Sequence, residues 1–277
     1  MVKLFTVIYI LCSVCSTNPD MSSPAFLQSI AAAEEAIAQS FTGPEAVKTQ
    51  PEIPVPKDYY DALKFLGLYK EDSKDNAELN KRNAVIRFES ICNMPITGKW
   101  NDKCQSALIK IYNDKQISYL DIVKNPPSED RWLALNKTSR ILTYYQKDIV
   151  IAKYPVAVGK SSTQTPSGKF TIVNKIVNPA WGGGGYANPV KGGSPDNPLG
   201  YRWMGLSLKN GGSIGIHGNN SPLSIGQYVS HGCIRMINSD VAELFENTKK
   251  DTIVWVGTES ELNDWGIVQP EYSFAVN

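Results

Sequence analysis

Residues 217–236 read HGNNSPLSIGQYVSHGCIRM, and this window contains His217, His231 and Cys233. The two histidines are the only ones in the 277-residue chain. A cysteine attacks as its thiolate, and imidazole is the usual base that removes the thiol proton. Gly232, directly before the cysteine, permits a sharp turn whose backbone N–H groups can hold an oxyanion. The window therefore indicates a candidate site for acyl transfer by a cysteine.

Two other interpretations are open from the residue types alone. In the first, Cys233 is a buried structural thiol, since cysteine is among the most buried residue types. In the second, the two histidines and Cys233 bind zinc, although no nearby carboxylate has the spacing of a fourth ligand. The composition does not decide among the three interpretations.

The composition restricts the class of protein. The chain has 28 Lys and Arg against 27 Asp and Glu, a formal net charge of +1, and 42% hydrophobic residues. This apolar content can fill a core, which excludes a wholly disordered chain. The balanced charge gives no electrostatic footprint for nucleic acid, and the absence of CxxC excludes zinc-finger arrays. The length suits one large domain or two modest ones.

The N-terminal residues predict export from the cytoplasm. Lys3 precedes the apolar run Leu4–Val14, which at about 11 residues is shorter than the ~18–20 that span a bilayer. Val14-Cys15-Ser16 is an acceptable cleavage site, so we expect a signal peptide at residues 1–16. A retained short anchor, lipid attachment at Cys15 and a buried N-terminal strand are the alternatives. We expect no stable membrane span and an extracytoplasmic protein, secreted or associated with the cell wall or envelope.

Residues 17–56 are expected to form a stalk or linker. Four prolines near its end favour a stiff, extended spacer. These prolines are Pro44, Pro51, Pro54 and Pro56.

Residues 57–115 predict a small unit of three helices. In the third helix Asn101 is the expected cap, and Cys104, Ala107, Leu108 and Ile111 follow at i, i+3, i+4 and i+7. Cys92 and Cys104 both fall in this unit, and whether they form a disulfide depends on the redox state outside the cell.

From about Arg131 the pattern changes to strands. The expected strands, rich in β-branched and aromatic residues, are Ile141–Tyr145, Ile149–Val158, Phe170–Val177, Ser213–His217 and Thr252–Val256. In the fourth of these, alternation predicts that Ile214 and Ile216 share the face opposite His217. The glycine-rich segment at residues 178–200 is expected to be a functional loop such as a lid.

One helix is expected in this part of the chain. It spans about Val241–Lys250, with Asp240 and Glu243 as its capping pair. Residues 258–277 form a C-terminal tail in which we find no pattern.

The window at residues 217–236 resembles the signature of the L,D-transpeptidases with a YkuD-type catalytic domain. Three upstream segments, Tyr154–Lys160, Thr165–Phe170 and Asn178–Trp181, resemble further blocks of that family in the same order. The resemblance covers about residues 130–257. Residues 57–115 are similar to the small peptidoglycan-binding domain often fused to such enzymes, chiefly through residues 84–88 and 94–98.

The resemblance implies an α+β multidomain chain, in which a three-helix unit precedes a mainly-β, β-sandwich-like catalytic domain. It implies that Cys233 attacks the third residue of a peptidoglycan tetrapeptide stem, releases the terminal D-Ala and forms a thioester. The side-chain amine of a second stem then gives a 3→3 cross-link in cell wall biogenesis. An L,D-carboxypeptidase and a non-catalytic wall-binding protein are the alternatives. Carbapenem-type β-lactams acylate the cysteine in many members of the family.

The resemblance also implies the roles of individual residues. Cys233 is the nucleophile, His217 moves the proton, and the backbone carbonyl of Gly218 orients the His217 ring. The Gly232 and Cys233 N–H groups form part of the oxyanion hole, and His231 lies just outside the reacting groups or contacts the substrate. The expected contacts of the substrate are Ser230, Arg235, Trp181 and Tyr186.

For Arg235 a salt bridge with a surface acid is the alternative to a substrate carboxylate. No cofactor and no metal are expected, and the expected partners are peptidoglycan stem peptides and glycan, with no nucleic acid. The oligomeric state cannot be read from the sequence.

Overall fold

The computed structural model describes residues 58–272, except residues 115–116, 118, 186 and 209–213. The expected signal peptide at residues 1–16, the expected stalk at residues 17–56 and the last residues of the tail lie outside the described residues. The chain divides into two compact units, Met1–Glu52 and Ile53–Asn277, and all described residues belong to the second. No helix in the described part is long and apolar enough to cross a membrane.

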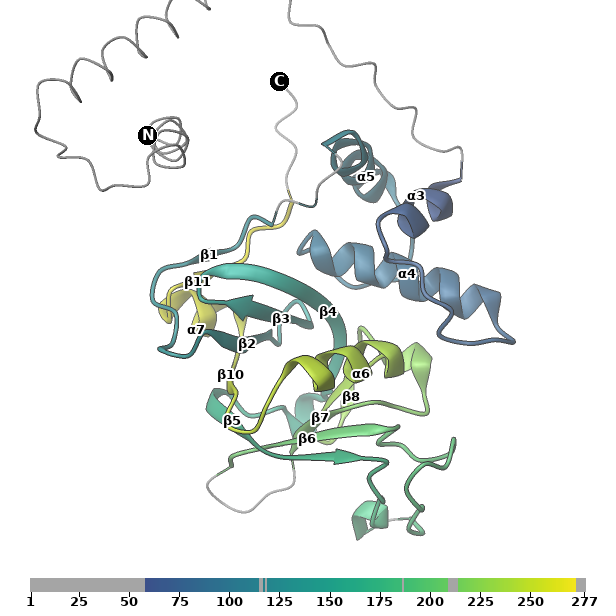
Figure 1. Cartoon of the computed structure of the whole chain (residues 1–277), viewed down its shortest axis with the longest axis vertical. Coiled ribbons are helices and arrows are strands. Elements are labelled where there is room, and N and C mark those ends of the chain that lie inside the picture. The colour runs from purple at the N-terminus through teal and green to yellow at the C-terminus, as the bar shows by residue number, and fades with distance from the viewer. Residues whose placement is uncertain (1–57, 115–116, 118, 186, 209–213, 273–277) are drawn as a thin grey trace, which may run out of the picture. The chain divides into compact units, whose positions relative to one another are not determined.

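Three helices occupy the segment in which the sequence predicts them: α3 (Tyr59–Phe65), α4 (Ala77–Ile91) and α5 (Asp102–Asp114) (Figure 1). Each begins with a side chain that accepts a backbone N–H bond, as helix N-termini require. These side chains are Asp58, Asn76 and Asn101. The four apolar residues of α5 that the periodicity selected are all buried in the core shared by the three helices. Cys92 and Cys104 are buried thiols rather than a disulfide.

Strands are the main regular structure in the rest of the described residues. They are β1 (Ile122–Val123), β2 (Arg131–Asn136), β3 (Ile141–Gln146), β4 (Ile149–Gly159), β5 (Gly168–Val177), β6 (Arg202–Leu206), β7 (Gly215–His217), β8 (Tyr228–Ser230), β9 (Ile234–Met236), β10 (Ile253–Gly257) and β11 (Ile267–Val268). Two helices complete this part, α6 (Asn238–Asn247) and α7 (Glu259–Asp264). This part is mainly β, as the sequence predicts.

The main sheet closes on itself. Its strand order is β3-β2-β10-β5-β6-β7-β9-β4-β8, and β3 also pairs with β4. The long strands β4 and β5 make this possible, because the two ends of each pair with different neighbours. β4 pairs with β3 along its first part and with β9 and β8 near its end. β5 pairs first with β10 and then with β6. Figure 1 shows the resulting curvature of β4.

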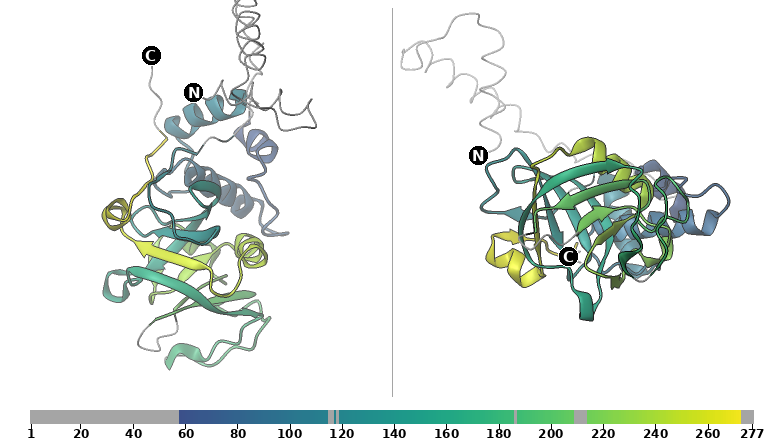
Figure 2. Two further views of the ribbon diagram at one scale, coloured as in Figure 1. Left: turned by 60° about the vertical axis from the view of Figure 1, so that its left-hand side comes forward. Right: turned by 90° about the horizontal axis from the view of Figure 1, so that it is seen from below.

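The core lies inside this closed sheet and under α6. It contains apolar side chains from the long strands together with Val241, Leu244 and Phe245 of α6. Figure 2 shows α7, in yellow, at the opposite end of the strands from the blue helices α3 and α4. The short strand β7, which ends at His217, lies between β6 and β9 in the sheet, so the candidate histidine is on a central strand.

Three features of this part differ from the expectation. Strand β7 begins at Gly215, two residues later than expected, and Ile214, which precedes it, is half-buried whereas Ile216 is buried. Helix α6 begins at Asn238 with Ile237 at its cap and no side-chain cap, so Asp240 and Glu243 are not a capping pair. The tail is structured, because a Thr258–Glu261 capping box starts α7. After α7, β11 pairs with β1.

Candidate active site

The turn that carries Cys233 joins β8 to β9. Gly232 has φ +110°, a conformation that side chains rarely adopt, and an added Cβ would lie 3.0 Å from Ile214 Cδ1. The Ser230 hydroxyl donates to the Cys233 carbonyl at 2.5 Å and accepts from the Gly232 N–H at 3.2 Å. Ser230 is buried, and its hydroxyl holds the turn together. The Gly232 N–H, expected in an oxyanion hole, is engaged by that same hydroxyl.

His217 is fixed on three sides. In the sheet, His217 pairs with Trp203 of β6 and with Arg235 of β9. Its ring stacks on the Trp203 ring, with the centroids 5.7 Å apart. Its side chain is only 2% exposed. Nδ1 lies 2.6 Å from the Gly218 carbonyl oxygen. Because a carbonyl only accepts, Nδ1 carries the proton in this contact, and Nε2 is left to accept one.

Burial sets the charge state of both groups. It lowers the pKa of His217 to about 4; contacts with the backbone of Gly218 and Leu199 oppose this shift, and the Arg235 charge adds to it. Burial also raises the pKa of the Cys233 thiol, against a backbone hydrogen bond from Gly215 and the charge of Arg235. At neutral pH the pair is therefore a thiol and a neutral imidazole, not a thiolate and an imidazolium.

Cys233 opens onto a groove of about 1,090 Å³. The groove lies over β5 and β6, and part of the glycine-rich segment lines it through Pro179, Ala180, Trp181, Gly182, Gly184 and Gly185. Trp181 and Val190 hold this segment by two backbone hydrogen bonds of 2.9 Å. His231 also lines the groove and is exposed. The groove therefore brings Cys233, His231 and Trp181 together, whereas the expected contact Tyr186 lies outside the described residues.

Arg235 lies beside the reacting pair and is partly buried. Its charge acts on both His217 and Cys233. Among the described residues, no carboxylate lies within ion-pair distance of Arg235, so none of these acids is the surface partner considered above. No group of three potential metal ligands occurs in the described part of the chain.

Sequence reasoning missed two asparagines of the site. Asn219 and Asn238 exchange two hydrogen bonds of 2.9 Å beside Gly218, and the Asn219 amide also donates to the Met236 carbonyl at 2.6 Å. Asn219 was visible in the window, but only as part of a motif. No sequence pattern marks Asn238 as part of the site, because its partner Asn219 is 19 residues away. Their hydrogen bonds depend on the approach of α6 to β7.

The chain is similar to known proteins over its strand-rich part. The family model for the L,D-transpeptidase catalytic domain (YkuD) matches residues 130–256. "Putative L,D-transpeptidase YqjB" of Bacillus subtilis is 39% identical over 135 residues, which are 48% of this chain and 74% of that protein. "Putative L,D-transpeptidase YkuD" of Bacillus licheniformis is 43% identical over 122 residues, which are 44% of this chain and 62% of that protein.

Among solved structures, the catalytic domain of an E. faecium L,D-transpeptidase is 28% identical with a TM-score of 0.38. The match covers 47% of this chain and 98% of that one. The family match and the identity to the B. subtilis relative, of which three quarters is covered, confirm the expected resemblance. The chain therefore belongs to the YkuD family of L,D-transpeptidase catalytic domains, and it is an enzyme of that type.

Proposed function

We propose that this protein is a peptidoglycan L,D-transpeptidase that forms 3→3 cross-links between stem peptides during cell wall biogenesis. The observation that carries the proposal is the placement of Cys233 at the groove. Cys233 directly precedes β9, which pairs with β7, the strand of the buried His217. Family membership supports a peptidoglycan substrate. The N-terminal sequence supports an extracytoplasmic location.

The first half of the reaction acylates the enzyme. Cys233 Sγ attacks the carbonyl carbon of the third stem residue while His217 Nε2 takes the thiol proton. Because both groups are neutral at rest, proton transfer accompanies attack. The tetrahedral intermediate then expels D-Ala, whose amine receives the proton from His217. The product is a thioester on Cys233 and free D-Ala.

The second half transfers the acyl group. The side-chain amine of another stem attacks the thioester, and His217 accepts a proton from this amine. The C–S bond then breaks, and the Cys233 thiolate takes that proton from His217. The proposed oxyanion role of the Gly232 N–H requires that this group exchange the Ser230 hydroxyl for the substrate oxygen. Arg235, which faces no acid among the described residues, is proposed to bind a stem carboxylate.

The remaining parts of the chain receive roles consistent with this activity. Trp181 supplies an apolar wall of the groove, Tyr186 a further substrate contact, and His231 a polar group at its exposed edge. Residues 57–115 are proposed to bind peptidoglycan glycan, and residues 1–16 and 17–56 to serve as export signal and stalk.

The Cys233→Ala variant tests the proposal. The wild-type chain is expected to release D-Ala from a tetrapeptide stem and to produce a cross-linked dimer when acceptor is added, and the variant to do neither. D-Ala release without a dimer at high acceptor concentration would identify an L,D-carboxypeptidase. D-Ala release by a folded Cys233→Ala variant would refute the cysteine mechanism.

A further inference from the structure

The peptide bond between Gly218 and Asn219 connects two interactions of the site. Its carbonyl oxygen, from Gly218, faces His217 Nδ1 at 2.6 Å. Its N–H, from Asn219, donates to Asn238 Oδ1 at 2.9 Å. In a trans peptide the C=O and N–H point in opposite directions within one plane. Holding the N–H on Asn238 therefore aims the carbonyl at the histidine.

The Asn238 side chain is itself held rigidly. Its Nδ2 donates back to the Asn219 carbonyl at 2.9 Å, so the amide contacts both sides of Asn219. A Cβ added to Gly218 would lie 2.1 Å from Asn238 Oδ1 and 3.3 Å from Gly200 Cα. The glycine thus allows the closest approach of the asparagine to this peptide. The contact leaves little freedom for the peptide plane to rotate.

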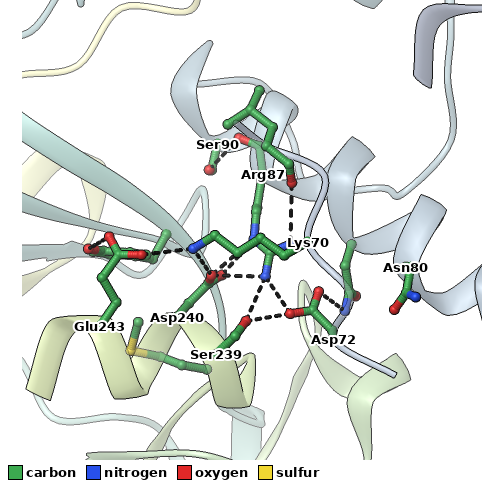
Figure 3. Close-up of polar contacts among 12 residues, drawn as sticks. Lys70, Asp72, Asn80, Arg87, Ser90, Ser239, Asp240 and Glu243 are labelled. Atoms are coloured by element: carbon green, nitrogen blue, oxygen red, sulfur yellow. Dashed lines mark hydrogen bonds and ion pairs between the residues drawn. The ribbon is translucent and has the colours of Figure 1, made fainter. Parts of the chain in front are cut away.

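Asn238 is the first residue of α6, and the next two residues are bound by the helical unit (Figure 3). Arg87 of α4 donates from Nε to both oxygens of Asp240 at 3.0 Å and from Nη2 to the Ser239 hydroxyl at 3.0 Å. Its Nη2 also donates to Asp72 at 2.9 Å. α6 has no side-chain cap, and these bonds connect its first turn to α4. Figure 3 shows Arg87 reaching from α4 to that turn.

We propose that Asn238 is a positioning residue for His217, and that Arg87 of the helical unit holds it in place through the first turn of α6. The helical unit is thereby part of the scaffold of the active site, in addition to any role in wall binding. The link runs from Arg87 to Ser239 and Asp240, to Asn238, and through the Gly218–Asn219 peptide to the ring. The effect on catalysis rests on the proposed function, whereas the effect on the ring can be measured without it.

The test uses the tautomer of His217, which a merely structural role would not change. Since the chain has only two histidines, ¹H–¹⁵N correlation spectra of the ¹⁵N-labelled full-length protein resolve both rings. We expect wild-type His217 to be protonated on Nδ1. Asn238→Ala should give a mixture of tautomers and lower kcat for D-Ala release about 10- to 100-fold with little change in KM. Arg87→Lys, which keeps the charge but loses the forked contacts, should change both in the same direction by less.

Two control variants separate positioning from general damage. Asn220→Ala alters the adjacent asparagine, which is exposed and donates only to the Asp196 carbonyl. Lys81→Ala removes an exposed ion pair to Glu78 within α4 and touches no residue of the proposed link. Both should keep the wild-type tautomer and kcat. A folded Asn238→Ala protein with the wild-type tautomer and kcat would overturn the proposal. If wild-type protein releases no D-Ala, the proposed function fails, and the tautomer comparison still decides the positioning role.

Discussion

Replacing Arg87 by Met should destabilise the protein strongly. The Arg87 side chain is 4% exposed and lies between Asp72 and Asp240, which are 4% and 1% exposed. In the variant Asp240 keeps Lys70 at 3.2 Å, but Asp72 keeps only neutral donors, the Asn83 amide and the Ser239 hydroxyl. One buried carboxylate is therefore left without a cation.

The size of the loss of stability follows from the unpaired Asp72 carboxylate. Removing one partner of a buried ion pair typically costs about 3–5 kcal/mol. For a protein of 150–250 residues, 1 kcal/mol changes Tm by about 2–4 °C, so Tm should fall by about 6–20 °C. The double variant Arg87→Met with Asp72→Asn also removes the uncompensated negative charge. This double variant should recover more than half of the loss.

The Tm difference between wild type and Arg87→Met should depend on pH through the pKa of Asp72. Burial raises the pKa of Asp72, but its hydrogen bonds and ion pair with Arg87 outweigh burial and hold that pKa below its ordinary value. The stabilisation is thus present at neutral pH and is lost as pH falls through the lowered pKa. In Arg87→Met the cation is gone and burial raises the pKa of Asp72, so mild acid neutralises the carboxylate. The Tm difference between wild type and variant should then shrink from about pH 7 to about pH 5.

Differential scanning calorimetry on wild type, both single variants and the double variant measures these differences. A Tm loss below about 3 °C in Arg87→Met would refute the buried-charge reasoning, since it corresponds to about 1 kcal/mol. A double variant no more stable than Arg87→Met would show that lost packing, not the charge of Asp72, causes the effect.

Three further predictions concern the active site. Because burial lowers the pKa of His217 to about 4, the rate of D-Ala release should stay constant from neutral pH to about pH 5 and fall only toward pH 4; a midpoint near the ordinary value of about 6.5 would contradict this. Because burial raises the pKa of Cys233, iodoacetamide should alkylate it slowly at neutral pH and faster only above about pH 8.5, followed by intact mass; fast alkylation at neutral pH would indicate a resting thiolate. Gly218→Ala places a Cβ 2.1 Å from Asn238 Oδ1 and should lower kcat by about 100-fold, which steady-state kinetics would detect; wild-type kcat would show that the loop adapts.

The sequence predicts the parts of the fold that depend on local pattern. The β3–β4 hairpin follows from two β-branched runs around a short turn, and α5 follows from its apolar period of three to four. The candidate site also follows from local information, because both histidines and Cys233 lie in one window.

The rest depends on contacts between distant residues. Asp240 and Glu243 have the spacing of a capping pair, yet they bind Lys70 and Arg87 of the helical unit, which lies about 150 residues earlier. The short strands β8 and β9 have only three residues each, too few for a period to be recognised. Ser230 holds a turn and Asn238 holds a peptide plane, and both roles appear only when the backbone is in place.

Mass spectrometry of the intact, processed protein with a tetrapeptide stem tests the central claim most directly. We expect an acyl adduct that peptide mapping assigns to Cys233, one equivalent of D-Ala released with it, and transfer to an added stem amine. An unmodified Cys233 after prolonged incubation, in protein whose thiol still reacts with a small alkylating agent at high pH, would contradict it.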